Sequence, residues 1–115
     1  MNTGLYGPYN LDNENIDTHV IGTGPGAYAL GYVNNGGGLA VLYIGRSDDD
    51  LNGRLKNHIG EKYSSFKYIF YRTAKDAYNK ECQLWHSFGG ERLLENKIHP
   101  DKGINKDWVC PICGV

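Results

Sequence analysis

Several features common in other protein classes are missing from this 115-residue chain. No apolar run approaches the roughly 20 residues that cross a bilayer, which argues against a membrane-spanning protein. Residues 1–15 are polar and lack the basic-then-apolar order of a signal peptide, so we expect a cytoplasmic protein. Internal repeats are also lacking, and the length suits one domain with a modest core.

A phosphate-binding loop is lacking as well. The glycine-rich run 22–26 precedes a predicted strand and has no Gly-Lys-Ser/Thr ending, which excludes a nucleotide-binding reading. The chain also lacks the positive surplus of a typical nucleic-acid-binding protein, because its net charge is −1. Basic residues nevertheless gather between positions 43 and 72. A local basic face is compatible with this pattern, and Arg46 and Lys56 are its candidate substrate-binding residues.

Cysteine is scarce, with three residues in the chain. An odd count that includes the Cys110-x-x-Cys113 pair favours a metal site over a disulfide scaffold. Structural zinc takes four ligands, and Cys82 and His86 supply a second pair four residues apart on one predicted helix. His99 is an alternative ligand. We therefore expect a structural Zn²⁺ that holds a knuckle-like tail, with an unpaired tail or a site shared between subunits as alternatives.

The apolar runs predict an α+β fold. Two predicted strands, 27–33 and 39–44, flank a glycine-rich turn and read as a β-hairpin. Further patterns predict a helix over 51–59, a strand over 67–72, a helix over 74–88 and a last helical turn within 91–97. The expected order is β-β-α-β-α, a small three-stranded mixed or antiparallel sheet flanked by helices.

Three segments follow from this reading. Residues 1–23 are expected to form a loose N-terminal arm, residues 24–100 the domain, and residues 101–115 a tail that packs on the domain.

Glu81 is the most informative residue, because it lies in the apolar stripe of the helix predicted over 74–88. Its helical neighbours are Ala77, Tyr78, Leu84, Trp85 and Phe88. A buried carboxylate is costly unless it is paired or holds a metal. The stripe alone leaves two interpretations open, a carboxylate paired with an arginine and a metal ligand.

Further polar side chains cluster in the pattern. Arg54 and His58 are four residues apart on the first predicted helix, so they share one face. Tyr28 and Tyr43 lie in the two strands of the predicted hairpin. A guanidinium of this kind can bridge phosphate oxygens, and a histidine beside it can move a proton.

Gly26-Ala27-Tyr28 and Tyr43-Ile44-Gly45 resemble the tripeptide pair of the GIY-YIG nuclease superfamily. Ala27 departs from the isoleucine of the pattern. The resemblance covers residues 24 to about 100. Asn105 is a weaker candidate than Asn96 for the C-terminal asparagine of the family. The ordered set that carries it comprises Tyr28, Tyr43, Arg54, His58, Glu81 and Asn96.

The resemblance implies a Mg²⁺- or Mn²⁺-dependent endonuclease that hydrolyses phosphodiester bonds. Glu81 would hold the divalent ion, Arg54 would offset charge in the transition state, and Tyr28 or Tyr43 would activate or orient the water, assisted by His58. The implied partner is nucleic acid, with DNA favoured, and a homodimer or partner protein could supply the recognition domain this chain lacks. The alternatives are a catalytically inactive nucleic-acid-binding module and a zinc-stabilised protein-interaction module.

Overall fold

A four-stranded antiparallel sheet forms the centre of the computed structural model, which describes residues 3–105 and 107–115. The strands are β1 (Tyr6–Asn10), β2 (Gly26–Val33), β3 (Leu39–Ser47) and β4 (Ser65–Phe70), in the order β1-β4-β2-β3. The helices are α1 (Asn13–His19), α2 (Leu51–Lys56), α3 (Ala74–Ser87) and α4 (Gly90–Leu93). The α+β class is therefore confirmed.

The expectations of a three-stranded sheet and a loose N-terminal arm are wrong, because residues 3–23 add a strand and a helix to the domain. β1 pairs with β4 at the sheet edge, and α1 places Ile16 and Val20 in the core with no exposed surface. β1 was not predicted because the strand contains Gly7 and Pro8, which disfavour a strand except at the edge of a sheet. α1 was not predicted because Ile16 is the one buried residue of that short helix, which leaves no repeating apolar pattern to recognise.

The β2–β3 hairpin forms as expected. Asn34 N–H donates to the Gly38 carbonyl at 2.8 Å, and the Asn34 side chain accepts from the N–H groups of Gly36 and Gly38. Alternate residues of β2 face opposite sides of the sheet. Tyr28 and Leu30 join a cluster with α1 and α2, whereas Ala27 and Ala29 join the cluster beneath α3.

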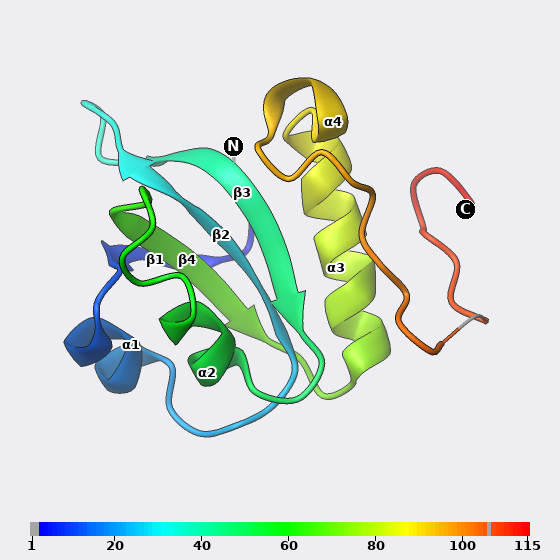
Figure 1. Ribbon diagram of the computed structural model, residues 1–115, viewed down its shortest axis with the longest axis horizontal. Coiled ribbons are helices and arrows are strands. Elements are labelled where there is room, and N and C mark those ends of the chain that lie inside the picture. Colours follow the sequence, from blue (N-terminus) through cyan, green and yellow to red (C-terminus); the bar gives the residue numbers. More distant parts are fainter. Residues whose placement is uncertain (1–2, 106) are drawn as a thin grey trace.

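Helix α3 lies along β2 and β3, and the C-terminal tail runs along the outer side of α3 (Figure 1). Thr73 caps α3 by accepting from Asp76 N–H at 3.1 Å, and Asp50 caps α2 in the same way through Gly53 N–H. In the tail, Trp108 and Cys110 pack against Tyr78 and Cys82 of α3. No helix among the described residues is long and apolar enough to cross a membrane.

Candidate functional site

A polar pocket of about 260 Å³ opens where β3, α2, α3 and the tail meet. It has room for several water molecules, each of which takes about 30 Å³ of liquid. Two arginines, three carboxylates and one glycine line it: Arg46, Arg54, Asp48, Glu81, Asp101 and Gly103. Two of the residues implied by the family resemblance, Arg54 and Glu81, therefore reach one pocket.

Glu81 is paired with an arginine, which is one of the two interpretations left open by its sequence position. It is 8% exposed, and Arg46 Nη1 donates to its Oε1 at 2.7 Å. Burial raises the pKa of the Glu81 carboxyl to about 7, although Arg46 opposes that shift. The carboxylate is thus paired with an arginine and also borders the pocket.

Arg46 is held from several sides. Its Nε donates to Asp48 Oδ1 at 2.7 Å, and its guanidinium carbon lies 5.1 Å from the ring centre of Tyr78 and 5.6 Å from that of Trp108. Lys56, the other expected substrate-binding residue, pairs with Asp17 at 2.7 Å. Arg54 differs from both, since its exposed guanidinium has no hydrogen bond or ion pair among the described residues.

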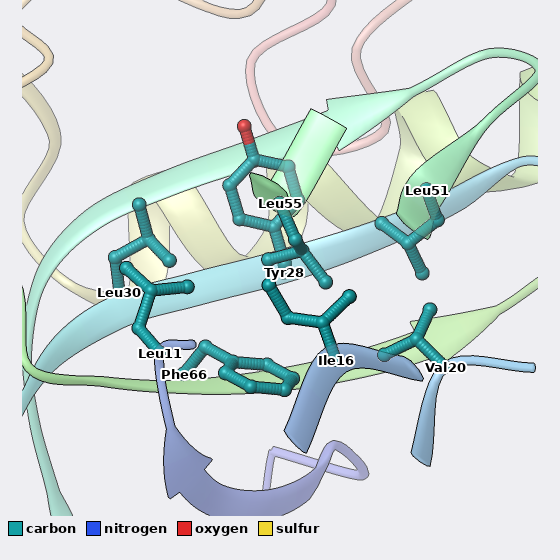
Figure 2. Close-up of a cluster of buried hydrophobic side chains, with 8 residues drawn as sticks. All are labelled: Leu11, Ile16, Val20, Tyr28, Leu30, Leu51, Leu55 and Phe66. Atoms are coloured by element: carbon teal, nitrogen blue, oxygen red, sulfur yellow. The ribbon is translucent and has the colours of Figure 1, made fainter. Parts of the chain in front are cut away.

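The two motif tyrosines stack beside His58. The Tyr28 and Tyr43 ring centres are 6.4 Å apart, and the Tyr28 hydroxyl bonds His58 Nε2 at 2.8 Å. Figure 2 shows that hydroxyl pointing away from the aliphatic side chains of the cluster. Burial raises the pKa of Tyr28 well above its ordinary value. Tyr43 is the more accessible of the two and borders a second pocket, which it shares with Glu81 and Asp101.

Two glycines of the motif have a packing role. Tyr28 lies directly opposite Gly45, and a Cβ at Gly45 would meet the Tyr28 Cζ at 2.4 Å. A Cβ at Gly26 would meet Leu51 Cδ2 at 2.6 Å and the Ile69 carbonyl oxygen at 2.4 Å. Both positions require glycine because another residue occupies the space of a side chain.

Asn96 takes a structural position. Its side chain accepts from Ile44 N–H at 3.1 Å and donates to the Ile44 carbonyl, so it acts as a partner for the free edge of β3. Its own carbonyl accepts from Trp85 Nε1 at 2.8 Å. These bonds engage both the oxygen and the nitrogen of the side-chain amide and anchor the Tyr43-Ile44-Gly45 segment. The weaker candidate, Asn105, donates to the Lys102 carbonyl within the tail.

A second group, made of His86, His99, Cys110 and Cys113, could bind a metal such as zinc. One ligand atom from each lies within 4.8 Å of the others. Tetrahedral zinc, with bonds of about 2.0–2.3 Å, separates its ligands by about 3.5 Å, so small movements would close the group on an ion. His86 Nε2 is buried without a hydrogen-bond partner among the described residues, and a cation would satisfy it.

Cys82 lies outside this group. The fourth candidate ligand is therefore His99, the alternative named from the sequence, and not Cys82, which the helical spacing had paired with His86. Burial raises the pKa of Cys82 to about 12, which keeps it a thiol. Burial also opposes ionisation of Cys110, but the backbone N–H groups of Cys113 and Ile112 and the His99 ring lower its pKa to about 6. Metal ligation requires the thiolate, which Cys110 forms readily and Cys82 does not.

Comparison of the chain with models of known families, with curated proteins and with solved structures finds no match.

Three residues at the sites have no counterpart in the sequence interpretation. Asp48 and Asp101 reach the pocket through their loops, and Glu61 bonds His58 Nδ1 at 2.8 Å. Glu61 carries a local signal, since it follows His58 by three residues with Gly60 between them.

Proposed function

We propose that this chain is a divalent-metal-dependent nuclease of the GIY-YIG type. One observation carries the proposal: an unpaired arginine, Arg54, and a buried carboxylate, Glu81, border one pocket, close to a hydrogen-bonded Tyr28–His58 pair. A phosphodiester needs positive charge for its oxygens and a group that accepts a proton from water. The pocket and its neighbours contain both kinds of group.

The donor set around the pocket fits a hard cation. Glu81, Asp48 and Asp101 offer carboxylate oxygens, which Mg²⁺ prefers. Glu81 Oε1 is engaged by Arg46, so an ion would share this carboxylate with the guanidinium or replace it. When bound, the ion would polarise the phosphodiester and offset charge on the leaving oxygen.

The remaining roles belong to side chains of the chain itself. Arg54 would bind a phosphate oxygen and stabilise charge that develops there in the transition state. Tyr28 stays protonated at neutral pH because burial raises its pKa, so it can accept a proton from water only if it passes its own to His58. Tyr43 faces the adjoining pocket and would orient the water or the substrate. Asn96 would act by positioning Ile44.

A nicking assay tests the proposal. Duplex DNA, single-stranded DNA and RNA are incubated with the protein in Mg²⁺, in Mn²⁺ and without added metal. We expect metal-dependent cleavage of at least one substrate, and loss of cleavage in Glu81→Gln, which keeps a partner for Arg46. Glu91→Gln, an exposed glutamate on α4, is the matched control. Cleavage by Glu81→Gln at the parent rate would refute the proposed role of Glu81 in binding the catalytic ion.

The Arg46–Glu81 ion pair favours one alternative, a nucleic-acid-binding module without catalysis. In that case the pair would serve stability, and the Glu81 carboxylate would not be free for an ion. The same assay decides, because binding of nucleic acid without cleavage under every metal condition supports this reading. DNA as the partner, and a homodimer or second protein as a recognition unit, are further proposals that the substrate panel and a mass measurement in solution would test.

We also infer that the group of His86, His99, Cys110 and Cys113 binds one structural Zn²⁺. Most hydrogen bonds of the described tail residues from Lys97 onward run within the tail, and the Cys110 thiol also contacts Cys82 of α3, so a metal would add a strong polar link between the tail and α3. Elemental analysis of protein purified without chelator should find about one zinc per chain. Cys113→Ser should lose it and melt lower, whereas Cys82→Ser should keep it. Equal zinc in both variants would refute this ligand set.

A further inference from the structure

Glu61 closes a chain of three hydrogen-bonded groups that begins at the buried tyrosine of the first motif. The Tyr28 hydroxyl contacts His58 Nε2 at 2.8 Å, and His58 Nδ1 contacts Glu61 Oε1 at 2.8 Å. The contacts use both nitrogens of one imidazole. The side chains come from β2, from the turn after α2 and from the loop that follows it.

The backbone after α2 builds this arrangement. Helix α2 ends at Lys56, and Glu61 N–H then donates to the His58 carbonyl at 3.1 Å, which closes a tight turn. Gly60 supplies the positive φ of +92° that the turn needs. The turn places the Glu61 side chain against the imidazole.

The hydrogen-bond pattern admits one arrangement of protons for the neutral ring. A carboxylate can only accept, so His58 Nδ1 must carry the hydrogen. Nε2 then keeps its lone pair and accepts from the Tyr28 hydroxyl. The ring is held in place by Tyr28, Tyr43 and Tyr63, whose centres lie 5.5, 5.1 and 6.5 Å from it. The Tyr63 hydroxyl donates to Glu95 instead, so it does not compete for Nε2.

We propose that Glu61 is a positioning residue, which fixes the His58 tautomer so that Nε2 can receive the Tyr28 proton. The inference rests on the nuclease function proposed above. In the reaction, the attacking water transfers a proton to the Tyr28 oxygen as the Tyr28 hydroxyl transfers its proton to Nε2. The water oxygen bonds to phosphorus, and the bond between phosphorus and the leaving oxygen breaks. The product imidazolium then faces the Glu61 carboxylate, which stabilises its charge. His58 later returns the proton to solvent or to the leaving oxygen.

Nitrogen-15 NMR of the histidine rings tests the tautomer without reference to activity. In the parent, the neutral His58 ring should carry its hydrogen on Nδ1, with the signal assigned by its loss in His58→Gln. Glu61→Ala should shift the ring towards the Nε2–H form, whereas Glu61→Gln should retain Nδ1–H because an amide oxygen still accepts. Glu91→Ala serves as the control. An Nε2–H ring in the parent, or an unchanged ring in Glu61→Ala, would overturn the proposal.

Single-turnover cleavage supplies the second readout. Glu61→Ala should lower the cleavage rate about tenfold to a hundredfold with unchanged nucleic-acid affinity, and Glu61→Gln should recover part of the loss. A parental rate in Glu61→Ala, with Glu81→Gln inactive, would refute the role of Glu61 and leave the nuclease intact. If the parent cuts nothing, the nuclease proposal fails, and the NMR result still decides whether Glu61 sets the tautomer.

Discussion

Replacing Gly45 by alanine should damage both the fold and the site, because Tyr28 occupies the space of the new methyl group. The added Cβ would lie 2.4 Å from the Tyr28 Cζ, 2.5 Å from its hydroxyl oxygen and 2.9 Å from Cε2. Carbon atoms in contact prefer about 3.5–4.0 Å, so the ring must move by about 1 Å. Tyr28 is 1% exposed and packs against Leu51 and Leu55, so it has no open space to enter.

Overpacking of a buried site costs about 1–3 kcal/mol. For a domain of this size, that range lowers the melting temperature by about 4–12 °C. Circular dichroism during heating measures the shift. Gly38→Ala is the matched control, because a Cβ there would meet Asn34 Nδ2 at an ordinary 3.7 Å in an exposed turn. The displaced hydroxyl should also lose His58, so cleavage at a temperature where Gly45→Ala is folded should fall as it does in Tyr28→Phe.

A melting temperature for Gly45→Ala within 1 °C or so of the parent would refute this reasoning, since the cited overpacking range begins at about 1 kcal/mol. Such a result would mean that Tyr28 does not lie across Gly45. The glycine of the second motif would then need another explanation, and the Tyr28–His58 contact would lose its structural basis.

Three further substitutions separate catalysis, anchoring and surface charge. Arg54→Ala should reduce turnover far more than affinity, and the opposite pattern in binding and single-turnover assays would make Arg54 a binding residue only. Asn96→Ala leaves the Ile44 N–H and carbonyl without a partner and should cost about 1–3 kcal/mol in denaturant unfolding, so an unchanged midpoint would contradict its anchoring role. Lys56→Ala breaks a partly exposed ion pair with Asp17 and should change stability by less than about 1 kcal/mol. A large loss of nucleic-acid affinity in Lys56→Ala would restore it as a substrate-binding residue.

Local patterning was sufficient for much of the fold. The apolar runs on either side of the Asn34–Gly38 turn identified β2 and β3, and the apolar stripe around Glu81 identified α3. These patterns work because residues two apart on a strand, or three to four apart on a helix, share a face whatever the rest of the chain does. Local patterns could not predict β1, because its pairing with β4 joins residues about sixty positions apart and its own residues include Gly and Pro, which disfavour a strand.

The candidate sites divide in the same way. The sequence placed Glu81 on a buried face and Cys110 and Cys113 in a metal-binding spacing, because each statement depends on neighbours within a few residues. Only the packed chain decided that Arg46 reaches Glu81 and that His99, not Cys82, joins the cysteine pair. Such contacts depend on how α3, β3 and the tail are stacked, and stacking is set by the whole core. Helical spacing predicted that Cys82 and His86 lie side by side as metal ligands. Tertiary packing instead buries Cys82 in the core and places His99 next to His86.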